Sequence, residues 1–195
     1  MKLTATTPIV LASASPRRKE LLSMLGFSFD IVTSDVEETS VQAQTPQQYV
    51  RDVALLKARD VAKKCTGKTI IGADTIVVYE QELLHKPTSR EEAIAHLQKL
   101  VNNRHQVMTA VAIIEADGTE TTFVEETTVR FKNVSQELRE AYVDSGDPFD
   151  KAGGYGIQTS GALLVDRIEG DYNNVVGLPI ATLTQTLLTL HLLKL

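Results

Sequence analysis

The stretch that decides the fold is Thr69-Ile70-Ile71-Gly72-Ala73-Asp74-Thr75-Ile76-Val77-Val78-Tyr79. β-branched residues dominate it, which predicts a buried strand. Asp74 is its only charged residue, and a carboxylate placed there loses hydration unless a metal ion, a cation or hydrogen bonds compensate. Asp74 is therefore either a structural residue at a bend beside Gly72 or a functional group whose partners lie elsewhere in the chain.

Composition and charge limit the class of protein. With 195 residues, 43% hydrophobic and 23% charged, the chain can bury a sizeable core, and we expect a single domain over residues 1–195, built from one or two lobes. A formal net charge of −5 argues against binding to a nucleic acid polymer or a membrane surface, since both require excess basic charge. One cysteine, no signal-peptide core and no membrane-length apolar run predict a cytoplasmic protein.

Near the N-terminus the sequence predicts an anion site. Residues 9–12 are a short apolar strand, and a serine-rich turn follows before a helix capped by Ser15 with Pro16 at its first position. Backbone N–H groups at such a helix start attract anions. Arg17 and Arg18 in the first turn oppose the helix dipole, which makes sense if they face an anionic ligand. The alternative is a pair of solvated arginines.

A second helix is predicted from Pro46 onward, capped by Thr45 with Gln48 completing a capping box. Lys57 lies in the middle of its apolar stripe, which consists of Val50, Val53, Ala54, Val61 and Ala62. Its ammonium either snorkels to water or meets an anion in the interior. We favour the interior position.

The loop before this helix, residues 34–44, carries Asp35, Glu37 and Glu38. Their carboxylates could be ligands for a divalent cation. The sequence by itself favours a plain solvated loop.

The remaining pattern predicts further strands and helices. The predicted strands are 29–33, 82–85, 105–115, 119–131 and 162–168, with Asp117-Gly118 as a hairpin turn between the third and fourth. The predicted helices are 89–101, 135–143 and one from about Ile180. We expect the last helix to dock on the core or on a dimer partner. The sequence therefore leaves open whether the protein forms a homodimer.

Residues 144–161 form the loop richest in functional residue types. Glycines at 153, 154 and 156 permit positive φ or close approach to a ligand, but the Gly-x-Gly-x-x-Gly fingerprint fails because Thr159 holds its last position. Gln158 can both donate and accept hydrogen bonds, so it suits recognition of a base or sugar edge.

The residue inventory favours phosphoryl chemistry. The four histidines lack metal-ligand spacing, and no Gly-x-Ser-x-Gly motif is present. What remains is a set of cations together with the acids Glu38 and Asp74; the cations are Arg17, Arg18, Lys57, Lys86 and Lys151. Cations and a divalent metal neutralise phosphate oxygens, while a carboxylate orients metal or water for attack.

Five segments together resemble the Maf family. They are Ser13-Ala14-Ser15-Pro16-Arg17-Arg18, Gly72-Ala73-Asp74-Thr75, Lys86-Pro87, residues 150–158 and residues 170–179. They occur in the family's order and cover nearly the whole chain. The resemblance implies an α/β fold with a two-lobed mixed sheet flanked by helices, similar to the inosine triphosphate pyrophosphatases. It also implies a cytoplasmic enzyme that hydrolyses a nucleoside triphosphate to its monophosphate and pyrophosphate with a divalent cation, Mg or Mn.

The resemblance further implies roles for single residues. Asp74 matches the family's proton acceptor, the base for the attacking water, and with Glu38 it would hold the metal. The positions expected to hold the triphosphate are Ser13, Arg18, Lys57 and Lys86. The positions associated with base preference are Arg17, Thr75 and Gln158, and their combination resembles the subfamily acting on dTTP and UTP. The pair Gly153-Gly154 departs from a more usual Gly-Ala but removes no functional group.

The sequence leaves three questions open. The same chemistry could act on 7-methyl-GTP or a modified nucleotide. The protein could instead bind a nucleotide without turnover and regulate cell division. Finally, Asp74 and Thr75 face opposite sides of a regular strand, so if both touch the substrate, either the strand bends near Gly72 or the substrate wraps around its end.

Overall fold

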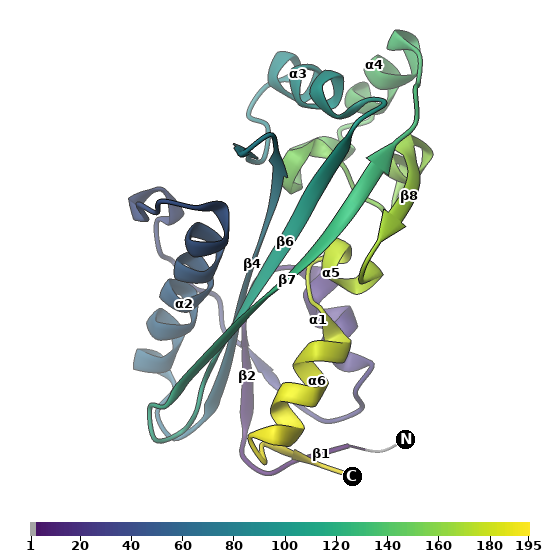
Figure 1. The fold of residues 1–195 in the computed structure, drawn as a ribbon. Coiled ribbons are helices and arrows are strands. Elements are labelled where there is room, and N and C mark those ends of the chain that lie inside the picture. The colour runs from purple at the N-terminus through teal and green to yellow at the C-terminus, as the bar shows by residue number, and fades with distance from the viewer. Residues whose placement is uncertain (1–2) are drawn as a thin grey trace. The chain divides into compact units, whose positions relative to one another are not determined.

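The computed structural model describes residues 3–195 (Figure 1). The helices are α1 (Pro16–Ser23), α2 (Pro46–Lys64), α3 (Arg90–Leu100), α4 (Gln136–Asp144), α5 (Tyr172–Val176) and α6 (Ile180–Thr189). The strands are β1 (Thr4–Ala5), β2 (Ile9–Ala12), β3 (Asp30–Ile31), β4 (Thr69–Tyr79), β5 (Glu82–Leu84), β6 (Arg104–Ile114), β7 (Glu120–Phe131), β8 (Val165–Glu169) and β9 (Leu193–Lys194). Short 3-10 helices occur at Glu38–Ser40, Asp147–Asp150, Ala152–Gly154 and Ser160–Leu164.

The main sheet has seven strands in the order β3-β2-β4-β6-β7-β8, with β5 paired to β4. β2 is parallel to both β3 and β4, whereas β5 is antiparallel to β4 and β8 is antiparallel to β7. The prediction of an α/β fold with a mixed sheet and flanking helices is therefore confirmed. No helix in the described part of the chain is long and apolar enough to cross a membrane.

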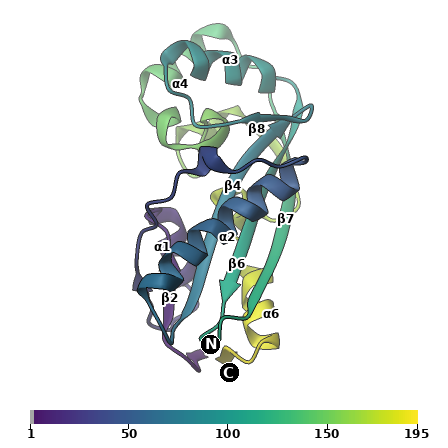
Figure 2. The same cartoon turned by 90° about the vertical axis from the view of Figure 1, so that its left-hand side faces the viewer.

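The chain divides into two compact units, and β4, β6 and β7 each contribute residues to both. The first unit comprises residues 1–74, 109–125 and 177–195, and the second comprises residues 75–108 and 126–176. In the first unit α2 lies on one face of the strands and α6 on the other, as the two views agree (Figures 1 and 2). Leu183 and Leu187 of α6 are fully buried, so this helix docks on the core of its own chain.

Helix starts were predictable because their caps are local. Ser15, Thr45, Ser89 and Ser135 each accept a hydrogen bond from the backbone N–H three residues on. The predicted strand over residues 162–168 is wrong at its beginning, because residues 160–164 form a 3-10 helix in which the Ala162 N–H donates to the Thr159 carbonyl. The strand predicted over residues 29–33 shortens to β3.

The core of the second unit contains a buried histidine. His105 is fully buried, its Nε2 lies 2.8 Å from the Tyr155 hydroxyl, and its ring packs edge-on against Phe131 and Tyr155. Its Nδ1 has no hydrogen-bond partner among the described residues. Burial lowers the pKa of His105 from 6.5 to about 3, because the interior disfavours the imidazolium.

This burial predicts a loss of stability in mild acid. The unfolded chain binds a proton at His105 as the pH falls through about 6.5, while the folded chain does not until about 3. Stability is therefore full above this window and falls within it, and between pH 7 and pH 5 the His105 contribution amounts to about 2 kcal/mol. Urea unfolding at both pH values checks it. His105→Gln, which cannot titrate, should show a correspondingly smaller loss, and equal losses in the two proteins would contradict the assignment.

Candidate active site

A glycine in β4 lets α2 lie directly against the strand. A Cβ atom at Gly72 would lie 2.7 Å from the Ala54 carbonyl oxygen and 2.8 Å from Ala58 Cβ, and Gly72 is not in the left-handed region. Its role is therefore close approach and not a bend. Since alternate strand residues share a face, Asp74 lies on the same side as Gly72, and Lys57 lies next to Ala58 on the helix that covers this side.

Replacing this glycine tests the packing. Gly72→Ala should destabilise the protein by about 2–3 kcal/mol, because the new methyl group overlaps helix backbone that cannot rotate away. Gly67→Ala is the control: Gly67 has a φ of +74°, but nothing lies within 4 Å of its Cβ position, so only local strain of about 1–2 kcal/mol is expected. Chemical denaturation of both variants checks the difference. If Gly72→Ala is no less stable than Gly67→Ala, close approach of α2 is not the role of Gly72.

Lys57 bridges two carboxylates. Its Nζ lies 2.8 Å from Asp74 Oδ1 and 2.7 Å from Glu38 Oε1. The side chains of Asp74 and Lys57 are only 9% and 15% exposed, so the alternative in which Lys57 snorkels into bulk water is wrong. A buried carboxylate requires a partner, and this ammonium provides it. Asp74 is thus held by an ion pair within a strand, and the structural alternative of a bend residue is excluded.

The acidic loop separates into two parts. Glu38, in the 3-10 helix Glu38–Ser40, turns toward Lys57, so the expectation of a plain solvated loop is wrong for this residue. Asp35 behaves as expected, since its carboxylate pairs with Lys64 at the surface. Sequence alone could not distinguish these acids because the difference depends on where α2 lies.

Arg18 is anchored beside this acid pair. Its Nε donates to the Gly177 carbonyl at 2.8 Å and its Nη1 donates to Ser13 Oγ at 3.3 Å. Burial lowers the pKa of Arg18 below its ordinary value, the negative charges of Asp74 and Glu38 oppose this, and the charge of Arg17 adds to it. A guanidinium keeps its proton nonetheless. The solvated-arginine alternative is therefore wrong for Arg18, while Arg17 is half-buried next to it.

Tyr49 joins this group, although no sequence pattern singled it out. It is half-buried in the first turn of α2. Burial raises the pKa of Tyr49, and the negative charges of Asp74 and Glu38 raise it further. Tyr49 precedes Lys57 by eight residues, two helical steps of four, and this spacing along one helix face is the signal that could have found it.

The other predicted site residues belong to the second unit. Thr75 is half-buried in β4, Lys86 is exposed after β5, and Gln158 is exposed in the glycine-rich loop. β4 is an unbroken strand across Asp74 and Thr75, so their side chains project from opposite faces. Gly72 therefore does not provide a bend that would bring the side chains of Asp74 and Thr75 to one face of the strand.

The segment carrying Lys86 packs against the glycine cluster. The Gly153 N–H donates to the His85 carbonyl at 3.2 Å, and a Cβ on Gly154 would meet Pro87 Cγ at 3.4 Å. Lys86 therefore lies in a segment that is tied on both sides to the loop that holds Gln158.

Lys151 does not behave as the other cations do. Its side chain is only 9% exposed, and its Nζ lies 2.6 Å from Asp150 Oδ1, 3.0 Å from Asp147 Oδ1 and 2.7 Å from the Asp147 carbonyl. Three acceptors match the three protons of an ammonium. The expectation that Lys151 serves as a phosphate-binding cation is therefore wrong, since its charge is neutralised within its own loop.

Glu38 and Asp74 are the acids that could hold a metal ion. In the part of the chain that the structure describes, no group of three or more His, Cys, Asp and Glu side chains could do so. Mg²⁺, however, is commonly held by one or two carboxylates together with substrate phosphates. Oxygens of both acids lie within 2.8 Å of the same Lys57 nitrogen, so this donor set fits a cation shared with a polyphosphate.

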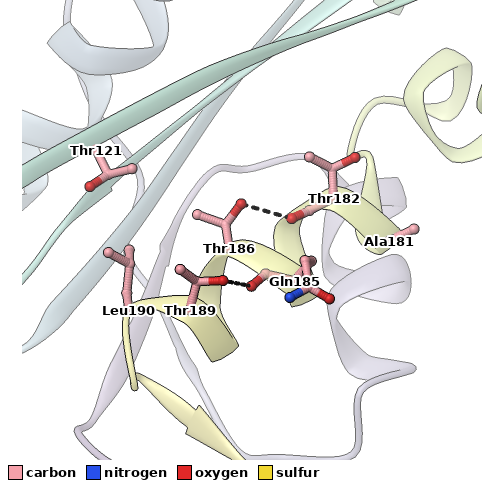
Figure 3. Close-up of a pocket in the computed structure, with 7 residues that line it drawn as sticks. All are labelled: Thr121, Ala181, Thr182, Gln185, Thr186, Thr189 and Leu190. Carbon is pink, nitrogen blue, oxygen red and sulfur yellow. Dashed lines mark hydrogen bonds between the residues drawn. The ribbon is translucent and has the colours of Figure 1, made fainter.

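A pocket elsewhere in the first unit does not suit a phosphate. It has a volume of about 490 Å³ and is lined by Thr121, Ala181, Thr182, Gln185, Thr186, Thr189 and Leu190 (Figure 3). None of the described residues that line it is charged. The hydroxyls of Thr186 and Thr189 donate to carbonyls one helical turn earlier. It therefore lacks the cations that a triphosphate needs.

The first-unit group can perform phosphoryl chemistry. It combines a buried carboxylate, a second acid, one ammonium, two guanidiniums and the Ser13 hydroxyl, drawn from β4, residues 38–40, α2, α1 and the turn after β2. The cations can neutralise phosphate oxygens, and a carboxylate fixed by a lysine can accept a proton from water.

Comparison with known proteins agrees with this chemistry. The family described as Maf-like protein matches residues 8–190. A dTTP/UTP pyrophosphatase of Bacillus anthracis is 49% identical over 179 residues, covering 92% of this chain and 93% of that protein, and one of Bacillus cereus matches equally. The solved structure of a HAM1 protein from Coxiella burnetii has a TM-score of 0.54 at 18% identity, covering 94% of this chain and 99% of that one. The last similarity shows a common fold.

Proposed function

The chain belongs to the Maf-like protein family, and on that premise we propose that it is an enzyme that hydrolyses dTTP and UTP to the nucleoside monophosphate and pyrophosphate. The curated relatives named dTTP/UTP pyrophosphatase support this substrate class, since they match 92% of the chain. The observation that carries the proposal is the buried carboxylate of Asp74 fixed by Lys57 at 2.8 Å. A purely structural role for Asp74 gives no reason for a second acid, Glu38, to share the same lysine.

In this mechanism Asp74 is the proton acceptor. Its Oδ1 is engaged by Lys57, so we assign Oδ2 as the oxygen that takes a proton from the attacking water. A general base must lie within hydrogen-bond reach of the proton that it takes, and the contact with Lys57 fixes the orientation of this carboxylate. After attack, the proton resides on Asp74 and pyrophosphate leaves the nucleoside monophosphate.

Four residues would hold the triphosphate: Ser13, Arg18, Lys57 and Lys86. Arg18 is restrained at two atoms by Gly177 and Ser13, so little side-chain entropy is lost when it binds an oxyanion. A divalent cation, Mg or Mn, would be held by Glu38 and Asp74 together with phosphate oxygens, and it would supply neutralisation of the developing negative charge.

Base preference is assigned to Arg17, Thr75 and Gln158. Because Thr75 lies on the strand face opposite Asp74, its role requires a substrate that extends past the strand. Thr75→Val, which removes a hydroxyl at constant shape, tests this role through the ratio of kcat/KM between bases. We also propose that residues 1–195 act as one domain, since three long strands contribute to both units.

Product analysis tests the reaction. The protein is incubated with dTTP, UTP, the other common nucleoside triphosphates and 7-methyl-GTP, with Mg²⁺ or Mn²⁺ and with EDTA, and the products are separated. We expect monophosphate and pyrophosphate from dTTP and UTP, and loss of turnover in EDTA. Preference for 7-methyl-GTP would change the substrate class. Tight nucleotide binding without turnover in either metal would favour the regulatory alternative.

A further inference from the structure

A dense hydrogen-bond cluster in the second unit has no assigned role. Its centre is Asp147, a half-buried aspartate in the 3-10 helix Asp147–Asp150. Its Oδ2 accepts from the Tyr142 hydroxyl at 2.7 Å and from Thr159 Oγ1 at 2.6 Å, and its Oδ1 accepts from Lys151 Nζ at 3.0 Å. Burial alone would raise the pKa of Asp147, but these donors outweigh it and the pKa is lowered, so the group is a carboxylate at neutral pH.

The cluster holds both ends of one β-turn. The Thr159 N–H donates to the Gly156 carbonyl at 3.4 Å, which closes a four-residue turn with Ile157 and Gln158 at its centre. The Gly156 N–H donates to the Tyr142 hydroxyl at 3.2 Å, and Thr159 donates directly to Asp147. One carboxylate oxygen therefore fixes both ends of the turn, one of them through Tyr142.

Two glycines make this compact arrangement possible. A Cβ on Gly156 would lie 2.5 Å from Lys151 Cε and 2.6 Å from Thr159 Oγ1. A Cβ on Gly161 would lie 2.6 Å from the Gly156 carbonyl oxygen and 2.9 Å from the Tyr142 hydroxyl. Neither glycine needs a positive φ. Because these glycines have no side chain, the methylene chain of Lys151 and the Tyr142 hydroxyl can lie directly against the turn.

We propose that Asp147, with Tyr142 and Thr159, is a positioning group that fixes the Gly156–Thr159 turn and thereby sets the base selectivity exerted through Gln158. This inference rests on the proposed function, in which Gln158 contacts the base. Gln158 is exposed at the tip of the turn, so burial does not restrain its position. A turn tied at both ends holds the Gln158 backbone in one conformation, so less backbone entropy is lost on binding.

The test compares Thr159→Val with Thr159→Ser, which keeps the hydroxyl, and with Ser160→Ala, which removes an exposed hydroxyl one residue away. Thr159→Val should raise the KM for dTTP about tenfold and reduce the preference for dTTP over GTP by a similar factor, as expected for one lost hydrogen bond to a charged group. Its kcat and its inhibition by inorganic tripolyphosphate, which has no base, should stay within about twofold. Thr159→Ser should restore the preference, and Ser160→Ala should not disturb it.

A second variant separates the outcomes. Tyr142→Phe removes the acceptor of the Gly156 N–H, so hydrogen exchange over residues 156–159 should accelerate about tenfold or more. Unchanged exchange there, or unchanged base preference in Thr159→Val, overturns the proposal. If the wild-type protein binds but does not hydrolyse dTTP, the proposed reaction fails instead, and the same preference is measured from dissociation constants of dTTP and GTP.

Discussion

An Asp74→Asn variant should bind dTTP about as tightly as the wild-type protein and lose turnover by about a thousandfold. Asparagine keeps the size of the side chain and can still accept from Lys57, but it cannot take a proton from water. Removal of a general base typically lowers the rate by about 10²–10⁴. Steady-state kinetics with dTTP and Mg²⁺, together with equilibrium binding of the nucleotide, measure the two quantities separately.

Asp60→Asn is the matched control for this variant. Asp60 also pairs with a lysine of α2, Lys64, at 3.0 Å, and it accepts a further hydrogen bond from the Asp35 N–H. Its replacement should leave kcat within about twofold. If Asp74→Asn retained wild-type kcat, the assignment of Asp74 as proton acceptor would be wrong, whatever the fate of the overall reaction.

Lys57→Met should have the second-largest effect, and it should lower both the stability of the protein and its kcat/KM. Without the ammonium, the Asp74 carboxylate is buried beside a second acid, Glu38, with no bridging charge between them. Breaking a buried ion pair by removing one partner costs about 3–5 kcal/mol, and since Glu38 is partly exposed we expect about 2–3 kcal/mol here. We also expect kcat/KM for dTTP to fall about a hundredfold, because one phosphate-binding cation is lost.

Lys64→Met provides the control on the same helix. Lys64 also contacts two carboxylates, Asp60 and Asp35, but its side chain is 42% exposed whereas that of Lys57 is 15% exposed. Exposed pairs contribute about 0–1 kcal/mol. Urea unfolding and kinetics of both variants should therefore separate them clearly. If the two substitutions changed stability and kinetics equally, the ion pairs of Lys57 would contribute no more than the exposed ion pairs of Lys64.

The parts of the fold that the sequence predicted are those encoded by neighbouring residues. Serine and threonine caps, Pro16, Pro46 and the Asp117-Gly118 turn act over three or four positions, so α1, α2, α3, α4 and the β6–β7 hairpin could be located in advance. The apolar run of residues 69–79 predicted β4 with its observed bounds. The Maf resemblance is confirmed by the family match.

What the sequence could not show depends on contacts between distant segments. Gly72 looked like a bend, yet its function is to let α2 pack closely, since a Cβ there would lie 2.7 Å from the Ala54 carbonyl oxygen. Lys151 looked like a ligand-binding cation, because the spacing of Asp147 and Asp150 does not reveal that their carboxylates turn back onto it. The two different positions of Asp35 and Glu38 follow only from the placement of α2. The roles assigned to all the site residues in binding and catalysis stay predictions, and for Arg17, Thr75, Lys86 and Gln158 the position of the side chain adds no support.

The central claim is that Asp74, fixed by Lys57, promotes hydrolysis of a pyrimidine nucleoside triphosphate to its monophosphate. The most direct measurement follows dTTP hydrolysis by the wild-type protein and by Asp74→Asn side by side, and quantifies dTMP, dTDP, pyrophosphate and orthophosphate. The account predicts dTMP and pyrophosphate in a one-to-one ratio from the wild-type protein, and about a thousandfold less of both from the variant. Formation of dTDP with orthophosphate, or equal product from the two proteins, would contradict it.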